Sequence, residues 1–349
     1  MLWRSTQESN ESYEIRKQTF KTYNRVLRNS VNLAKKNYYH KQFQIFRNDI
    51  RRTWMTIINR SGNKKEYPDQ FLFDGETVSD KNLIAEEFNK YFTSVGSKQS
   101  EKIVVPGNKS FTDYLRTPTL YAFHFKAIDD QEIVRIIDSL KSKSSYGHDR
   151  ISNKLLKYVK YEIAKPLKLL VNQSVECGIF PSNLKDARVI PIYKKDNEQN
   201  FSNYRPISLL PSISKIYERI LYNQIYQHFT NHELFYPSQY GFRKLHSTEY
   251  AALELVNRLT IDMDNSRVPI NIYLDLSKAF DTIDHTILLH KLSYYGFKNK
   301  AHDLMTSYLT NRSQYVEFQD IKSSSHITCG VPQGSILGPL LFIIYIKEL

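Results

Sequence analysis

Residues 269–284 read Pro-Ile-Asn-Ile-Tyr-Leu-Asp-Leu-Ser-Lys-Ala-Phe-Asp-Thr-Ile-Asp, and their pattern changes halfway along. Up to Leu276, aliphatic residues alternate with Asn271, Tyr273 and Asp275, which is the period of a half-buried strand. Asp275 is therefore predicted to project from the face opposite the aliphatic row, near the end of the strand. This stretch indicates an α+β fold in which a strand is followed by a helix.

The residues after this strand predict a turn and then a helix. Asp284 is a candidate N-cap, and Gly296 is a candidate stop signal. A carboxylate at a strand end, five residues before the aromatic Phe280, indicates a metal site with a shaped wall beside it. The alternative from this stretch alone is that Asp275 is a turn residue and Phe280 belongs to the core.

A second stretch, residues 329–343, reads Cys-Gly-Val-Pro-Gln-Gly-Ser-Ile-Leu-Gly-Pro-Leu-Leu-Phe-Ile. Its Gly-x-Pro-Gln-Gly core runs directly into an apolar helix. The glycines let the backbone approach a planar ligand closely, with the amide of Gln333 among them.

Together, the segments 274–281 and 330–339 resemble reverse transcriptases of non-LTR retrotransposons, the jockey-like and CR1-like group. The resemblance extends over about residues 128–349 and is looser before that. It implies an α+β right-hand polymerase: a basic helical N-terminal extension and linker over 1–120, fingers over 121–268, and an incomplete palm over 269–349.

The resemblance also implies roles for individual residues. Asp275 and the carbonyl of Leu276 would bind metal, and Asp275 would be catalytic. Phe280 would stack under the sugar and exclude a 2′-hydroxyl. The remaining implied contacts are Lys194 and Arg205 to the triphosphate, Gln333 and Gly334 to the nascent base pair, and Arg243 and Lys244 to the template–primer. From the residues alone, the favoured interpretation of Arg205 before Pro206 is a turn cap.

Nucleotide addition in this family would use two Mg²⁺ ions, an RNA template, a DNA primer and deoxynucleoside triphosphates. The family's remaining carboxylates follow the Gly-x-Pro-Gln-Gly motif on an Asp-Asp hairpin, which we expect to lie beyond Leu349. We therefore expect these 349 residues to have negligible polymerase activity as they stand. Two alternatives are a non-catalytic nucleic-acid-binding remnant and a reading frame whose product never folds.

Charge is unevenly distributed along the chain. Residues 1–65 hold 15 Lys and Arg against 4 Asp and Glu, within a total net charge of +13. Such an excess favours a polyanion-binding surface over a merely solvated helix face. Phe20, Tyr23, Leu27, Val31 and Tyr38 follow helical spacing and predict a helix over 13–60.

The positions of the cysteines and the hydropathy of the chain indicate the cellular compartment. Cys177 and Cys329 stand far apart, which excludes a disulfide framework and a zinc finger. The N-terminus lacks an apolar signal core, and the run from Leu340 to Ile346 is too short to span a bilayer. We expect an intracellular protein of the nucleus or cytoplasm that does not enter membranes.

Other segments have local signatures of secondary structure. Residues 71–94 predict a short strand or turn followed by an amphipathic helix. The pair Asp129-Asp130 predicts a helix cap rather than a metal site. Residues 181–195 contain a strand that ends in paired cations, and the segments 181–195 and 203–219 resemble the fingers hairpin of reverse transcriptases. Residues 300–310 predict a helix, and residues 315–328 a further hairpin.

Overall fold

The computed structural model describes residues 10–47, 67–73, 75–101, 110–115, 118–319, 321–327 and 329–347. It divides into two compact units, residues 1–67 and 68–349. The division therefore lies well before residue 120, where the sequence predicts a boundary. The assignment of 121–268 to fingers and 269–349 to palm stays a prediction.

The described part of the first unit is one long helix, α1 (Asn10–Ile45). Most of its large apolar residues, including Phe20 and Tyr23, are exposed. The predicted continuation of this helix towards residue 60 lies largely outside the described residues.

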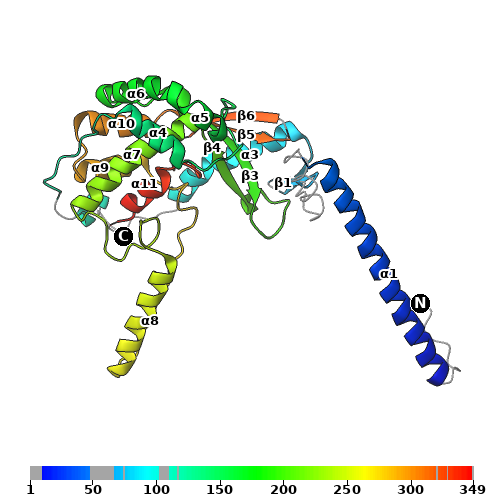
Figure 1. Cartoon of the computed structure of the whole chain (residues 1–349). Coiled ribbons are helices and arrows are strands. Elements are labelled where there is room, and N and C mark those ends of the chain that lie inside the picture. Colours follow the sequence, from blue (N-terminus) through cyan, green and yellow to red (C-terminus); the bar gives the residue numbers. More distant parts are fainter. Residues whose placement is uncertain are drawn as a thin grey trace. The chain divides into compact units, whose positions relative to one another are not determined.

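The second unit contains a four-stranded sheet with the order β4-β3-β5-β6 (Figure 1). β3 pairs antiparallel with β4 and parallel with β5, and β5 pairs antiparallel with β6. A separate two-stranded ribbon joins β1 and β2. The strand bounds are β1 (Phe71–Phe73), β2 (Glu76–Val78), β3 (Ala187–Tyr193), β4 (Tyr204–Leu209), β5 (Arg312–Phe318) and β6 (Ile321–Ile327).

Helices form the rest of this unit. Their bounds are α3 (Lys81–Ser100), α4 (Asp130–Ser139), α5 (Asn153–Tyr158), α6 (Lys160–Cys177), α7 (Ser212–Asn231), α8 (Thr248–Asp264), α9 (His285–Tyr294), α10 (Asn299–Leu309) and α11 (Gly338–Tyr345). Short 3₁₀ turns lie at Phe111–Tyr114, Ser182–Leu184 and Phe201–Asn203. A large apolar cluster joins α4, α6, α7, α9, α10 and α11. This helical core and the sheet together support the predicted α+β class.

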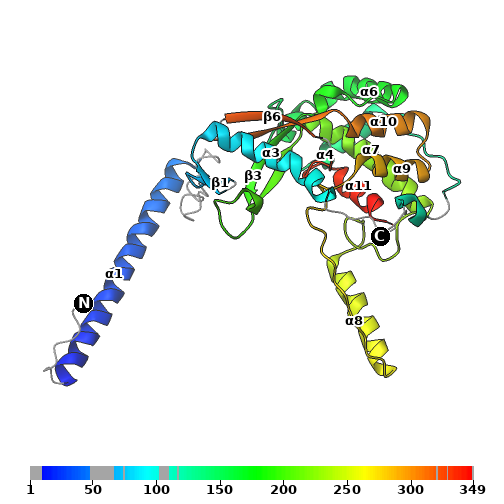
Figure 2. The ribbon, with the colours of Figure 1, turned by 180° about the vertical axis from the view of Figure 1, so that it is seen from behind.

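Helix α3 packs on β5 and β6 through buried polar side chains as well as apolar ones (Figure 2). Asn89 donates to the carbonyl of Ser323 at 3.1 Å and accepts from Gln314 at 3.0 Å. Phe71 and Phe88 pack against each other, with ring centroids 5.1 Å apart. β1 and α3 thus pack against the sheet, and the assignment of residues 1–120 to an N-terminal extension and linker stays a prediction.

Several helix caps form where the sequence predicts them. The side chain of Asp129 accepts from the amide of Glu132 and caps α4. The side chain of Asp284 accepts from the amide of Ile287 and caps α9. A carboxylate at this position satisfies an otherwise unpaired amide and complements the helix dipole.

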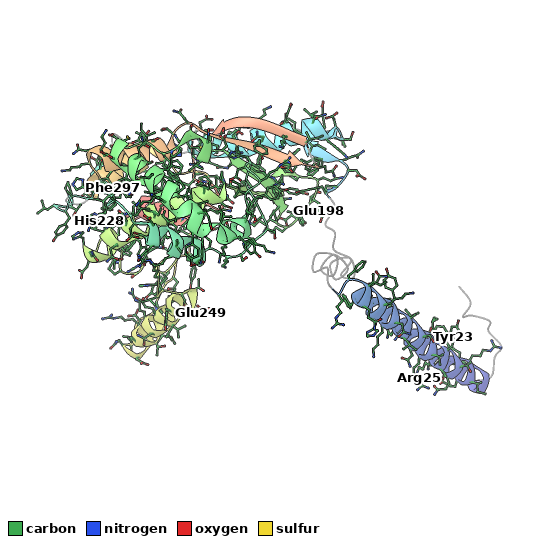
Figure 3. The ribbon with its side chains drawn as sticks, turned by 45° about the horizontal axis from the view of Figure 1, so that its top comes forward. Tyr23, Arg25, Glu198, His228, Glu249 and Phe297 are labelled. Carbon is green, nitrogen blue, oxygen red and sulfur yellow. The ribbon has the colours of Figure 1, made fainter. Side chains whose placement is uncertain are left out.

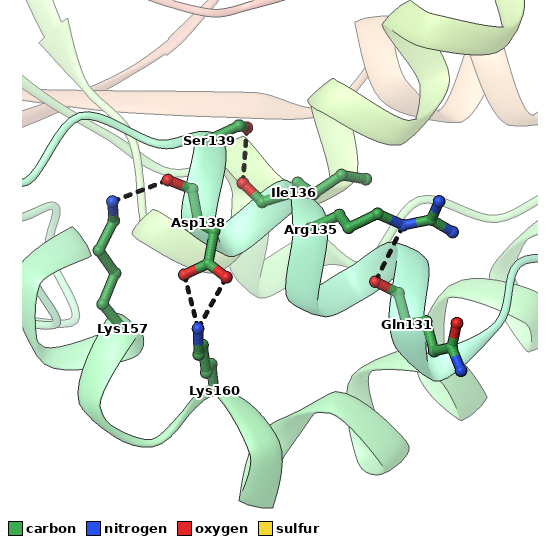
Figure 4. A network of polar contacts seen from close by, with 7 residues as sticks. All are labelled: Gln131, Arg135, Ile136, Asp138, Ser139, Lys157 and Lys160. Carbon is green, nitrogen blue, oxygen red and sulfur yellow. Dashed lines mark hydrogen bonds and ion pairs between the residues drawn. The ribbon is translucent and has the colours of Figure 1, made fainter.

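A polar network ties α4 to the helices that follow it (Figure 4). Lys160 donates to both carboxylate oxygens of Asp138 at 2.8 and 2.7 Å, and Lys157 donates to the Asp138 carbonyl at 2.8 Å. These cations meet the C-terminal end of α4, where the helix dipole favours positive charge. The network orients α5 and α6 against α4.

The strand expected over residues 269–276 is not observed. Residues 268–276 form no strand, and Ile270 and Leu274 are 86% and 88% exposed. A strand needs a hydrogen-bonded neighbour, and no described residue pairs with the backbone of 268–276. Helix α8 buries none of its residues and projects from this unit in both views (Figures 1 and 2).

Candidate nucleotide site

The turn that carries Gln333 is held between two segments that are distant in sequence. The amide of Val331 donates to the carbonyl of Phe280 at 2.9 Å, and the amide of Gly330 donates to the carbonyl of Ile283 at 2.8 Å. On the other side, the amide of Ser208 on β4 donates to the carbonyl of Gln333 at 2.8 Å. The two motifs that the sequence analysis singles out therefore form one continuous backbone structure.

The side chain of Gln333 is held by Asp281. Its Nε2 donates to both carboxylate oxygens, at 2.9 and 3.0 Å. Burial raises the pKa of Asp281, while the Gln333 hydrogen bonds and the charge of Lys278 act in the opposite direction. Asp281 is thus a desolvated acceptor with a dedicated donor.

Gly334 occupies a position that needs glycine. Its φ of +122° lies in a region that L residues avoid, and a Cβ there would lie 2.6 Å from the carbonyl oxygen of Ser208. This close approach is what allows the Gln333 turn to pack against β4.

Phe280 forms an aromatic wall beside the turn. Its ring lies 4.9 Å from that of Phe342 on α11 and 5.7 Å from that of Phe242, measured between centroids. Phe242 is half exposed. The wall is therefore packed on one side and open on the other.

A small cavity lies between this turn, β4 and α3. Its volume is about 30 Å³, which is enough for one water molecule. Its lining includes Phe92 and Thr93 of α3, Pro206 and Ser208 of β4, and Asp281 and Gln333. Helix α3 thus contributes directly to the surroundings of Asp281.

Asp275 and Leu276 do not join this cluster. Both lie in the irregular segment 268–276 and both are exposed. The side chain of Asp275 makes no hydrogen bond or ion pair with any residue that the structure describes. Within those same ranges, no three His, Cys, Asp or Glu side chains gather as a metal site. The structure therefore brings together Phe280, Gln333 and Gly334, but not the predicted metal ligands.

Lys194 and Arg205 lie at the β3–β4 hairpin. Arg205 is opposite Ile192, and the amide of Lys194 donates to the carbonyl of Asn203 at 2.8 Å. In this antiparallel register, Arg205 and Lys194 share one face, while buried Tyr204 points to the other. Both cations are exposed.

Arg243 holds its own loop together. Its Nη1 donates to the carbonyls of Tyr236, Pro237 and Gln239 at 2.9, 3.3 and 3.4 Å. The ammonium group of neighbouring Lys244 lies 4.9 Å from the ring centroid of Tyr226. The contacts of Arg243 are those of a loop organiser, and the predicted contact of both cations with template–primer stays a prediction.

Glu218 is a residue of this region that the sequence analysis does not single out. It is fully buried on α7, accepts from the amide of Ile336 at 2.6 Å and accepts from the hydroxyl of Tyr308 at 2.8 Å. It therefore holds the segment between Gln333 and α11. Helical spacing could have revealed it, because Glu218 shares the buried face of Leu221 and Ile225.

The helices were compared with the length and hydropathy of a membrane-spanning segment. None of the helices in the described ranges combines the length and the apolar character needed to cross a membrane.

Comparisons with known proteins place these observations in a family. Residues 192–349 match the model of the reverse transcriptase (RNA-dependent DNA polymerase) family. The chain is 33% identical over 245 residues to the probable RNA-directed DNA polymerase from transposon BS of Drosophila melanogaster, a match that covers 68% of this chain and 26% of that protein. It is 30% identical over 239 residues to the RNA-directed DNA polymerase from mobile element jockey of the same species, covering 68% and 26%.

A third relative is the probable RNA-directed DNA polymerase from transposon X-element of Drosophila melanogaster, 32% identical over 226 residues, covering 62% of this chain and 24% of the relative. The chain thus spans about a quarter of the length of these curated relatives. Residues 192–349 are a reverse transcriptase domain, homologous to the RNA-directed DNA polymerases of non-LTR retrotransposons.

Proposed function

We propose that this chain belongs to an RNA-directed DNA polymerase that adds deoxynucleotides to a primer by two-metal phosphoryl transfer. The observation that carries this proposal is the joining of the Phe280 and Gln333 segments by backbone hydrogen bonds within a domain that matches the reverse transcriptase family. The aromatic wall of Phe280 and the close-packed Gln333 turn form two sides of a site suited to a flat ligand.

The donor set of Asp275 and Leu276 fits Mg²⁺. Mg²⁺ prefers oxygen ligands and takes only one or two protein carboxylates, the remainder coming from water and substrate phosphates. Asp275 and Leu276 are both exposed residues, which suits such an open site. When bound, the metal would activate the primer hydroxyl and neutralise charge on the leaving pyrophosphate.

The other residues have roles that their chemistry supports. Arg205 offers a planar fork for a triphosphate, and Lys194 on the same hairpin face offers a point charge. Phe280 would lie under the sugar, and Gln333 with Gly334 would meet the nascent base pair. In this assignment 121–268 are fingers, 269–349 are part of the palm, and Arg243 with Lys244 flank the template–primer.

The segment 268–276 keeps the alternating pattern of a strand although its backbone is unpaired. We propose that it becomes a palm strand when a further strand pairs with it. Pairing would satisfy its amides and carbonyls and would fix the direction of Asp275.

A dead-end complex tests the proposal without requiring catalysis. The chain is mixed with an RNA template, a dideoxy-terminated DNA primer and Mg²⁺, and its retention on the hybrid is measured with each deoxynucleoside triphosphate. The complementary nucleotide should slow dissociation at least about tenfold relative to a mismatched one. Equal dissociation with all four nucleotides would contradict the proposal.

A second candidate function is nucleic-acid binding without nucleotide selection, and the charge of α1 favours it. Residues 10–45 hold eight Lys and Arg against two Glu, and side chains such as Tyr23 and Arg25 project from the helix (Figure 3). Each phosphate neutralised steepens the slope of log K against log salt by about 0.7–0.9. Replacing Arg25 and Arg28 by Gln should reduce the slope by about 1.4–1.8, whereas replacing exposed Lys81 and Lys98 should not.

A further inference from the structure

The contact between Asp281 and Gln333 can have only one polarity. An ionised carboxylate accepts hydrogen bonds and donates none, so the amide nitrogen of Gln333, and not its oxygen, must face Asp281. Both carboxylate oxygens take part, at 2.9 and 3.0 Å. The reversed amide would bring two acceptors together in a desolvated place.

The position of Asp281 is itself fixed by its surroundings. Helix α3 passes so close that a Cβ on Gly96 would lie 2.1 Å from the carbonyl oxygen of Asp281. The preceding carbonyl, that of Phe280, accepts from Val331. The backbone that carries the Asp281 carboxylate therefore cannot shift without disturbing α3 or the Gln333 turn, and the two hydrogen bonds to Gln333 orient the carboxylate itself.

The amide oxygen of Gln333 is left turned away from Asp281. It accepts no hydrogen bond from any residue in the ranges that the structure describes, although Gln333 lines the cavity beside the turn. An amide has separate donor and acceptor ends, so fixing one end fixes what the other end can offer.

We propose that Asp281 is a positioning residue that locks the Gln333 amide, so that Gln333 meets a nucleotide as a hydrogen-bond acceptor. The inference rests on the proposed function for its ligand and on the Asp281–Gln333 contact for its geometry. The ligand group it selects is a hydrogen-bond donor, namely a sugar hydroxyl or a base amino group of the incoming deoxynucleotide or its template partner.

The contact is tested in the intact chain by NMR of side-chain amides after glutamine-selective ¹⁵N labelling. The Gln333 signals are identified by their loss in Gln333→Met. They should exchange slowly with water and shift as a nearby carboxyl titrates, and both properties should disappear in Asp281→Asn. Persistence of both in Asp281→Asn would overturn the positioning role. Asp284→Asn, which removes an exposed carboxylate three residues away and keeps an oxygen that can cap α9, should change neither.

The acceptor role is tested by exchanging the two side-chain chemistries. In Asp281→Asn, one of the two acceptor oxygens is replaced by a donor, so the Gln333 amide is held in either orientation instead of one, and retention by complementary nucleotide in the dead-end complex should fall about twofold or more with hybrid affinity unchanged. In Asp281→Asn with Gln333→Glu, an Asn donor again meets an acceptor and a carboxylate oxygen faces outward, so nucleotide retention should recover.

The outcomes separate this inference from the proposed function. Wild-type-like nucleotide retention in Asp281→Asn, or a double variant no better than the single one, would overturn the acceptor role. A wild-type chain that selects no nucleotide would overturn the proposed function and the acceptor role together, and the amide NMR would then decide the positioning role by itself.

Discussion

Asp281 and Gln333 lie 52 residues apart in sequence, and two hydrogen bonds of 2.9 and 3.0 Å join their side chains. This pair links the segment after Asp275 to the Gly-x-Pro-Gln-Gly turn. Ser208 on β4 joins the same turn through its backbone, and Glu218 on α7 holds the residues that follow it. Three segments of the reverse transcriptase domain thus converge on one short turn and the residues that follow it.

Sugar selection should depend on Phe280. Phe280→Ala removes the ring that packs on Phe342 and opens the space where a 2′-hydroxyl would fit. We expect the preference for deoxynucleotide over ribonucleotide in the dead-end complex to fall at least about tenfold. Phe242→Ala serves as the control, because it removes a neighbouring ring that is half exposed. An unchanged preference in Phe280→Ala would refute the assignment.

The turn should be sensitive to any side chain at Gly334. Gly334→Ala carries a positive-φ cost of about 1–2 kcal/mol and a steric cost against Ser208 of about 1–3 kcal/mol. Gly75→Ala measures the positive-φ cost by itself, because Gly75 also has positive φ but has nothing near its Cβ position. Denaturant unfolding measures both. Equal losses of stability in the two variants would show that the Gly334–Ser208 approach is not constrained.

Stability should depend on pH through Glu218. Burial raises the pKa of Glu218, so the folded chain holds this proton more tightly than the unfolded chain does. The stability that this proton provides is fully present below the unfolded pKa of about 4.3 and is lost as pH rises through the folded value. The free energy of unfolding of Glu218→Gln, relative to wild type, should therefore increase with pH above about 4.

Urea titrations at several pH values measure this difference for Glu218→Gln and for a control, Glu162→Gln on the exposed surface of α6. The control should differ from wild type by a constant amount. A Glu218→Gln difference that is equally independent of pH would mean that Glu218 does not titrate in the folded chain as its burial requires.

Local pattern predicted most of the secondary structure. The caps at Asp129 and Asp284, the β3–β4 hairpin, α10 and the β5–β6 hairpin are confirmed, because capping and periodicity are encoded within a few residues. The strand at 269–276 is wrong because a strand also depends on a neighbour, which local alternation cannot supply.

The candidate site was predictable only in part. Phe280, Gln333 and Gly334 are placed together, as two separate motifs suggested. The partnership of Asp281 with Gln333 was missed, because it depends on how two distant segments pack. Glu218 was missed because a glutamate in a helix usually faces water, although its spacing relative to Leu221 and Ile225 marks the buried face.

We propose that Asp275 holds a metal ion at the nucleotide site. The most direct test is a Mg²⁺ titration of the dead-end complex with the complementary nucleotide, in wild type and in Asp275→Asn. We predict that Asp275→Asn raises the Mg²⁺ concentration at half-maximal retention at least about tenfold and leaves hybrid binding without nucleotide unchanged. An identical Mg²⁺ midpoint in the two proteins would contradict the claim.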